Sequence, residues 1–304
     1  PASRLGEQHR RQRDEDVVDV EARQPGAEAL ADLRPLQPLE EIARGVGGLL
    51  EDGAGEPVVF LHGASLGSSA RAFERNLPAF AAAGFRAIAY DQPGFGLTDN
   101  PTDYSTSYRT QFIVKFLDAI DASRAALVGH SQAAGMAVRV ALQHPARLSH
   151  LLLVGGGGVL PPLPGKSASG PAEGQEGTSA TPTLEDMRAI MNNNFFNKSL
   201  ITTELLEQRL KMSLGKNFNA FSARSKAREP QGGGVPLYQR LKEISMPLLL
   251  LYGRQDRGSA AERAALLKEQ EPSLRIELID NAAHLVIWEA ADKFNEAALR
   301  FLKQ

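Results

Sequence analysis

Short apolar runs bounded by turn residues recur along the chain from residue 58 onward. Six of them stand out: Val58–Leu61, Ala87–Tyr90, Ala125–Val128, Leu151–Val154, Pro247–Leu251 and Ile276–Ile279. Continuous apolar runs of this length are typical of strands buried on both faces of a sheet. Helical stretches, such as Ala70–Ala83 and Ala134–Gln143, separate most of them. The alternation predicts an α/β fold with a mostly parallel central sheet and helices on both faces, and it places ligands beyond the carboxyl ends of the strands.

The alternation stops between about residues 161 and 245. A Gly-, Pro- and Ser-rich stretch at Pro161–Pro182 comes first, and helical periodicity follows at Leu184–Asn194 and Thr203–Leu214. We expect residues 161–245 to form an inserted helical cap. Its first part should be a flexible loop, because this composition buries too little apolar surface to offset the entropy lost on ordering. The core domain would then comprise residues 51–160 and 246–304.

Residues 1–50 give no clear prediction. They mix charge-rich runs with Pro and Ala, and only Val17–Val20 has the pattern of a short strand.

Composition narrows the function classes. The 304 residues carry a formal net charge of -2 with both signs interspersed, so we expect no nucleic-acid partner. No apolar run is long enough to span a membrane, and the first thirty residues are charged, so we expect a cytoplasmic protein acting on a small molecule. With no Cys, thiolate nucleophiles and Cys-ligated metals are excluded, and neither a cofactor nor a metal is expected. The oligomeric state stays open, a homo-oligomer included.

Ser131 lies between a predicted strand and a predicted helix, in the segment Gly129–Ala133. A nucleophilic serine on such a tight strand-to-helix turn needs small residues two positions away on either side, and Gly129 and Ala133 fit. The alternative is a serine that only caps the following helix.

Asp256 and His284 also follow predicted strands directly. A serine hydroxyl becomes a good nucleophile when a base takes its proton, and a neutral imidazole suits that task near neutral pH. An aspartate that accepts the other ring N–H fixes the tautomer of that imidazole. The chain order Ser131, Asp256, His284 fits a nucleophile, an acid and a base. Taken alone, Asp256 fits a turn residue better and His284 fits a structural histidine at a strand end better.

The segment His62–Ala64 follows the first predicted strand. We expect the backbone N–H groups of Ala64 and Gln132 to form an oxyanion hole, with the Ser65 hydroxyl nearby. The Pro/Gly turn Asp91–Gly96 follows the next strand and is interpreted as a structural corner.

From about Glu56 to Leu302 the chain resembles the α/β-hydrolase superfamily, and more narrowly the meta-cleavage product hydrolases, which split carbon–carbon bonds in aromatic-ring degradation. The narrower likeness lies in Asn197–Arg209 and in Trp288–Asn295. It implies that Arg209 pairs with a substrate carboxylate; the alternative is a solvated residue on a cap helix. The other residues expected around the substrate are Ser65, His130, Leu285 and Trp288.

Three features depart from the narrower family. His130 stands where that family has Asn, Leu285 where it has Trp, and Ala64-Ser65 replace a glycine run. Gly129-His130-Ser131-Gln132 looks more like esterases, and Gln132 would bring a polar side chain into the pocket. These departures favour a serine hydrolase of a small ester, lactone, amide or related carbonyl compound.

Carbon–carbon bond hydrolysis of 2-hydroxy-6-oxo-hexa-2,4-dienoates is the main alternative. A cofactor-free oxygenase and a non-catalytic ligand-binding protein on the same fold also stay open. Ser131 argues against haloalkane and epoxide hydrolases, because both need a carboxylate at this position.

Overall fold

A seven-stranded sheet forms the centre of the molecule. It is seen in a computed structural model that describes residues 46–165, 181–226 and 235–304. The strand order is β1-β3-β2-β4-β5-β6-β7. The strands are β1 (Leu50–Asp52), β2 (Glu56–Leu61), β3 (Phe85–Ala89), β4 (Ala125–His130), β5 (Leu148–Val154), β6 (Leu248–Gly253) and β7 (Arg275–Ile279). All neighbours pair in parallel except β1, which runs antiparallel to β3. The predicted mostly parallel sheet is therefore confirmed, and each of the six apolar runs overlaps a strand.

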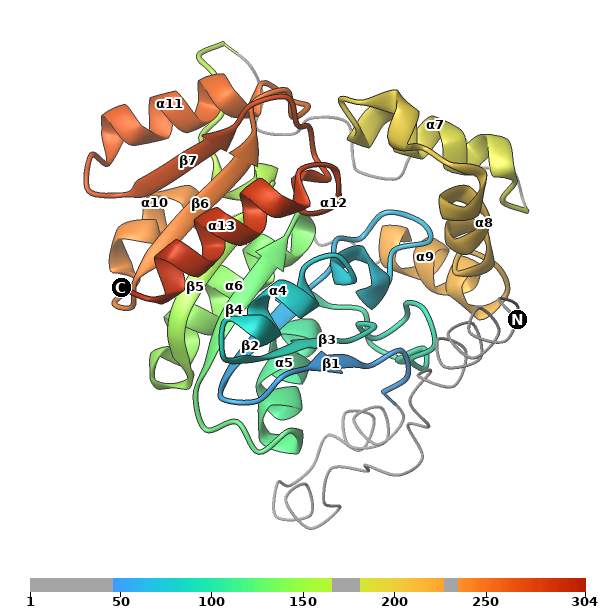
Figure 1. Ribbon diagram of the computed structural model, residues 1–304, viewed down its shortest axis with the longest axis horizontal. Helices are drawn as coiled ribbons and strands as arrows, with labels where there is room; N and C mark the ends of the chain where they lie inside the picture. The colour runs from blue at the N-terminus through green and yellow to red at the C-terminus, as the bar shows by residue number, and fades with distance from the viewer. Residues whose placement is uncertain (1–45, 166–180, 227–234) are drawn as a thin grey trace, which may run out of the picture.

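Helices cover both faces of this sheet (Figure 1). They include α4 (Leu77–Ala82), α5 (Thr106–Ala119), α6 (Gln132–Gln143), α11 (Ala260–Gln270) and α13 (Ala291–Leu302). Alternate residues of one strand point to opposite faces: Val59 and Leu61 pack in one apolar cluster with α5 and α6, whereas Val58 and Phe60 pack in another with α4 and α13. Burial on both faces explains why the strands read as unbroken apolar runs.

The prediction of one continuous helix over residues 70–83 is wrong. A 3-10 turn covers Ala70–Phe73, and α4 begins only at Leu77, with Pro78 in its first turn. Proline has no N–H to donate, and its ring clashes with the carbonyl four residues earlier, so one helix cannot run through this position.

Two further helices differ from the prediction. The expected helix at residues 203–214 ends early, since α8 spans Thr203–Lys211 and the Ser213 hydroxyl donates to the carbonyl of Leu210. Another helix, α9 (Lys216–Lys226), follows and was not predicted. Its residues are largely polar and carry no clear apolar stripe.

Helices α7 (Leu184–Asn194), α8 and α9 lie together at one end of the molecule (Figure 1), and we call them the cap helices. They form hydrogen bonds to loops that follow the carboxyl ends of strands. Arg209 donates to the carbonyl of Leu66 at 2.9 Å, and Asn217 donates to that of Gly96 at 2.9 Å. A short helix, α10 (Leu237–Arg240), leads back to the sheet. The cap helices therefore face the edge of the sheet where ligands were expected.

Some expectations lie outside the described residues. They are the strand at Val17–Val20, most of the segment 1–50, and residues 166–180 of the Gly/Ser-rich loop. In the part of the chain that the structure describes, no helix is long and apolar enough to cross a membrane.

Candidate active site

Ser131 sits on a sharp turn between β4 and α6. Its φ of 59° and ψ of -124° lie in a region that non-glycine residues rarely adopt, and its N–H donates to the carbonyl of Val154 at 2.7 Å. A Cβ added at Gly129 would come within 2.8 Å of the Ala133 carbonyl oxygen. The turn therefore requires the glycine that the sequence places there, and it holds the serine at the carboxyl end of the sheet.

Loops after two neighbouring strands bring Asp256 and His284 to this serine. His284 Nε2 lies 2.8 Å from Ser131 Oγ, and His284 Nδ1 lies 3.0 Å from Asp256 Oδ1. A side chain at Gly253, the last residue of β6, would come within 2.3 Å of the carbonyls of Ala282 and Ala283, so the loop carrying His284 packs directly on the end of β6. All three side chains are buried. Hydrogen bonds thus connect them in the order Ser131, His284, Asp256.

Two other side chains approach His284. His130 Nε2 donates to the backbone carbonyl of His284 at 2.9 Å, so this residue, expected at the substrate, also fixes the histidine loop. Arg257 Nη2 lies 3.2 Å from His284 Nε2. Sequence reasoning missed Arg257; the only signal was its place directly after Asp256.

The predicted oxyanion donors adjoin Ser131. A Cβ at Gly63 would lie 3.4 Å from Ser131 Oγ, so the backbone leading to Ala64 passes close to the serine. Within the described residues, the N–H groups of Ala64 and Gln132 donate to no other protein atom. Both are thus free to bind an oxygen that carries negative charge.

The side chain of Gln132 does not line the pocket, contrary to expectation. Its Oε1 accepts a hydrogen bond from Arg109 Nη1 at 2.7 Å, which turns it toward helix α5. This partner could not be predicted from the sequence, because Arg109 lies on a helix distant from Gln132 along the chain.

His62 supports the loop before Ala64. Its Nδ1–H donates to the Gly63 carbonyl at 2.7 Å, and its Nε2 accepts from the N–H of Gln92 at 3.0 Å. Burial lowers the pKa of His62 to about 3, so the ring is neutral and keeps both bonds at ordinary pH. His62 therefore belongs to the scaffold of the loop that carries Ala64.

Asp91 ties the turn after β3 to its surroundings. Its carboxylate accepts from the N–H groups of Ala70 at 2.7 Å and Leu97 at 2.8 Å. Burial raises its pKa to about 6. These contacts fit the interpretation of Asp91–Gly96 as a structural corner.

A pocket opens above Ser131. It is lined by Gly63, Ser65, Ser68, Ala72, His130, Ser131, Asn194, Arg209, Arg257, His284 and Leu285. Arg209 reaches it from α8, and its Nη2 donates to Ser65 Oγ at 2.9 Å. Burial lowers the pKa of Arg209 to about 10, so the guanidinium stays charged at neutral pH. Four of the five residues expected at the substrate therefore meet in one pocket with Ser131.

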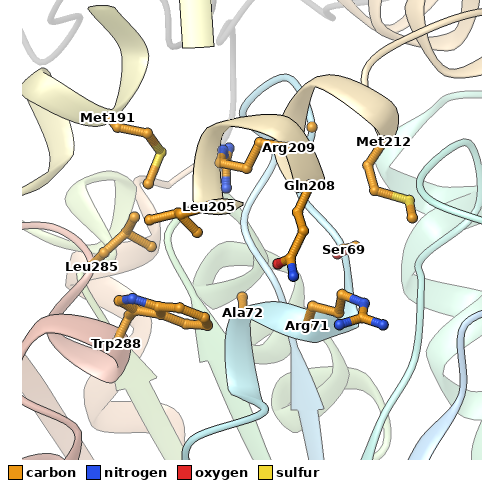
Figure 2. A pocket seen from close by; sticks show the side chains of 11 residues that line it. Ser69, Arg71, Ala72, Met191, Leu205, Gln208, Arg209, Met212, Leu285 and Trp288 are labelled. Carbon is orange, nitrogen blue, oxygen red and sulfur yellow. The ribbon is translucent and has the colours of Figure 1, made fainter. Parts of the chain in front are cut away.

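The fifth, Trp288, lines a neighbouring pocket instead (Figure 2). This second pocket lies between the loop after β2 and the cap helices. It shares Ala72, Arg209 and Leu285 with the pocket of Ser131. Sequence reasoning did not predict this compartment, because its lining comes from four separate segments of the chain.

Comparisons with known proteins agree with the fold. Residues 58–297 match the model of the alpha/beta hydrolase family. A 2-hydroxy-6-oxononadienedioate/2-hydroxy-6-oxononatrienedioate hydrolase of Paraburkholderia phymatum is 34% identical over 84% of this chain and 90% of its own length. The same-named enzyme of Burkholderia vietnamiensis is 33% identical over 82% and 88%.

Among solved structures, a meta-cleavage product hydrolase from Pseudomonas fluorescens IP01 superposes with a TM-score of 0.69. It is 25% identical to this chain, and the match covers 84% of this chain and 93% of the other. The resemblance seen in the sequence is confirmed: the chain belongs to the α/β-hydrolase family.

Proposed function

We propose that this protein is a serine hydrolase in which Ser131 is the nucleophile, His284 the general base and Asp256 the residue that orients the histidine. One observation carries the proposal: Ser131 Oγ lies 2.8 Å from His284 Nε2, whose ring bonds to Asp256 on its other side. This is the arrangement that activates a hydroxyl for attack on a carbonyl carbon.

The first half-reaction follows from these positions. Ser131 Oγ attacks the carbonyl carbon while its proton passes to His284 Nε2. The negative charge that develops on the carbonyl oxygen is bound by the N–H groups of Ala64 and Gln132. As the tetrahedral intermediate collapses, His284 returns the proton to the leaving group, and an acyl-enzyme remains on Ser131.

Water completes the cycle. It attacks the acyl carbon as His284 takes one of its protons, and collapse of the second tetrahedral intermediate releases the acid and restores the Ser131 hydroxyl. Asp256 stays ionised and stabilises the imidazolium formed in each half-reaction. A small ester, lactone, amide or related carbonyl compound would fit this sequence of steps.

A second candidate is hydrolysis of a carbon–carbon bond in a 2-hydroxy-6-oxo-hexa-2,4-dienoate. Arg209 favours it, because a charged guanidinium on the wall of the Ser131 pocket can bind the carboxylate of such a substrate. The names of the relatives also favour it. His284 would assist ketonisation of the dienol, after which Ser131 or water would attack the ketone.

Two residues favour an ester substrate over a dienoate. His130 and Leu285 depart from the meta-cleavage pattern, and the His130 side chain is engaged by the backbone carbonyl of His284. Its imidazole therefore holds the histidine loop as well as lining the pocket of Ser131.

The test compares kcat/KM for p-nitrophenyl acetate and for a 2-hydroxy-6-oxo-hexa-2,4-dienoate, using the wild type and Ser131→Ala. We expect the ester to be turned over and Ser131→Ala to abolish this turnover. Preference for the dienoate by several orders of magnitude would instead assign carbon–carbon cleavage. Turnover of neither substrate would support a ligand-binding role, and activity that survives Ser131→Ala would rule out the covalent mechanism.

A further inference from the structure

Arg257 stands directly after Asp256 and beside the proposed base. Its Nη2 lies 3.2 Å from His284 Nε2, and the residue lines the pocket of Ser131. Arg257 as a whole is exposed, whereas Ser131, Asp256 and His284 are buried, so it stands at the rim of the pocket. The two half-reactions leave Arg257 without a task, although its guanidinium contacts the nitrogen that receives the proton.

Two donors approach one acceptor at His284. The ring bonds to Asp256 through Nδ1 at 3.0 Å, so in the neutral imidazole Nδ1 carries the hydrogen and Nε2 presents a single lone pair. Ser131 Oγ at 2.8 Å and Arg257 Nη2 at 3.2 Å both lie within hydrogen-bond distance of that lone pair. The N–H of Arg257 therefore competes with the hydroxyl whose proton Nε2 must take.

The charge of Arg257 acts on the same step. In the proposed mechanism His284 becomes an imidazolium in each half-reaction, and a like charge beside it raises the free energy of that imidazolium. At a separation of about 4 Å in a partly solvated site, this repulsion changes a rate by about tenfold. Arg257 therefore opposes proton transfer to His284, and an anionic group that binds Arg257 would offset this effect.

The leaving part of the substrate is the part that comes closest to Arg257. His284 Nε2 returns its proton to the leaving group, so the leaving group must approach Nε2 and with it the Arg257 guanidinium. Arg209 enters the same pocket from α8 and keeps its charge at neutral pH. An acid group on the leaving part would thus enter a pocket with guanidiniums from a strand-end loop and from the cap.

We propose that Arg257 is a specificity-determining residue that selects substrates whose leaving part carries an acid group. With a neutral substrate, Arg257 stays on His284 and opposes base catalysis. With an acidic substrate, the N–H groups of Arg257 donate to the carboxylate. The lone pair of Nε2 is then left to the Ser131 hydroxyl, and the carboxylate offsets the guanidinium charge. Selectivity arises here from a repulsion that only the preferred substrate relieves.

This inference rests on the proposed function, because it concerns the base that serves Ser131. It holds for both candidate reactions. An ester would carry the acid group on its alcohol or phenol part. In a 2-hydroxy-6-oxo-hexa-2,4-dienoate the carboxylate and the ketone lie at opposite ends of the chain, so breaking the bond next to the ketone leaves the carboxylate on the departing part.

4-Acetoxybenzoate and its methyl ester test the proposal, because they share one skeleton and differ in the charge on the departing phenol. Arg257→Met should lower kcat/KM about tenfold for the acid, which loses a charge-assisted bond. The same variant should raise kcat/KM about tenfold for the methyl ester, and this gain should lie in kcat rather than in KM. Arg257→Lys keeps the charge and should restore part of the wild-type preference for the acid.

Arg254→Met is the matched control. Arg254 lies on the same loop, is exposed and pairs with Asp280, so its loss should change neither rate. A residue that only held the His284 ring in place would behave differently from our proposal: Arg257→Met would then slow both substrates alike. Labelling of Ser131 by a neutral alkyl fluorophosphonate adds a second readout and should be about tenfold faster in Arg257→Met than in wild type.

Calorimetry with Ser131→Ala protein measures binding without turnover. Its dissociation constant for 4-acetoxybenzoate should rise about tenfold when Arg257→Met is added, and that for the methyl ester should stay the same. Equal falls in kcat/KM for both substrates in Arg257→Met, or a dissociation constant for the acid that does not respond, would overturn the proposal. Absence of turnover in the wild type together with Arg257-dependent binding of the acid would instead count against the proposed function alone.

Discussion

The sheet side and the cap side of the pocket are built differently. On the sheet side, Ser131, Asp256 and His284 are buried, bond to one another, and stand on loops whose paths are fixed by close backbone contacts at Gly129 and Gly253. On the cap side, α8 reaches the sheet side through the Arg209 bonds to Ser65 and Leu66, and its neighbours Glu207 and Gln208 are exposed.

This difference separates chemistry from selectivity. In the proposed mechanism, groups on the sheet side touch the reacting atoms of every substrate, so changes there should lower kcat whatever the substrate is. Groups on the cap side touch only the outer parts of the substrate, so changes there should alter the ratio between substrates. Substitutions on each side test this division.

Ser131→Ala should have the largest effect. Removing the nucleophile should lower kcat by about 10³- to 10⁶-fold on ester and dienoate alike. Steady-state kinetics with both substrates measures it, with Ser199→Ala on the cap as a control that keeps full activity. A large loss on only one substrate would show that the two reactions do not share the serine.

Asp256→Asn should come next. The amide cannot hold the imidazole in the required tautomer, so kcat should fall by about 10³- to 10⁴-fold with KM little changed. Kinetics on p-nitrophenyl acetate, with Asp280→Asn as the exposed control, measures the loss. A loss of less than about tenfold would mean that Asp256 does not orient His284.

Arg209→Met should have a smaller and selective effect. A charge-assisted bond to a carboxylate is worth about 10- to 100-fold in binding. Methionine should therefore lower kcat/KM by that amount for a substrate with an acid group and by much less for a neutral ester. The exposed Arg188→Met on α7 is the control. Equal losses of kcat/KM on both substrates would contradict this, and would show that Arg209 acts on every substrate, as the sheet-side residues do.

Asp91 should affect stability more than rate. Its pKa is raised to about 6 in the folded protein, so the protonated form is favoured there relative to the unfolded chain. This contribution to stability is fully present below about pH 4 and is lost as the pH rises through about 6, by up to about 3 kcal/mol.

Urea unfolding between pH 4 and 7 checks this prediction. The free energy of unfolding of the wild type, relative to that of Asp91→Asn, should fall as the pH rises across that window. The same difference measured against the exposed Asp99→Asn should not change with pH. A difference that is constant with pH would contradict the raised pKa.

The parts that could be predicted from the sequence are those fixed by burial and chain order. Strands buried on both faces leave unbroken apolar runs, and the residues directly after three of these runs, Ser131, Asp256 and His284, meet because parallel strands end at one edge of the sheet. Local pattern therefore sufficed for six of the seven strands and for the sheet side of the pocket.

Other parts carry no local pattern. Strand β1 is three residues long with two of them exposed, so it shows no alternation. The contacts of Arg109 with Gln132 and of Arg257 with His284 depend on how helices and loops pack, and a charged residue in a sequence does not reveal that it is buried. The pocket lined by Trp288 depends on four segments that meet only in the folded chain.

In the proposed mechanism Ser131, activated by His284, is the nucleophile. Intact-mass and peptide analysis after reaction with an alkyl fluorophosphonate tests it directly. We expect one adduct per chain, on the peptide that contains Ser131, and a rate of labelling that falls by orders of magnitude in His284→Ala. An adduct on a different residue, or equal labelling rates in wild type and His284→Ala, would contradict it.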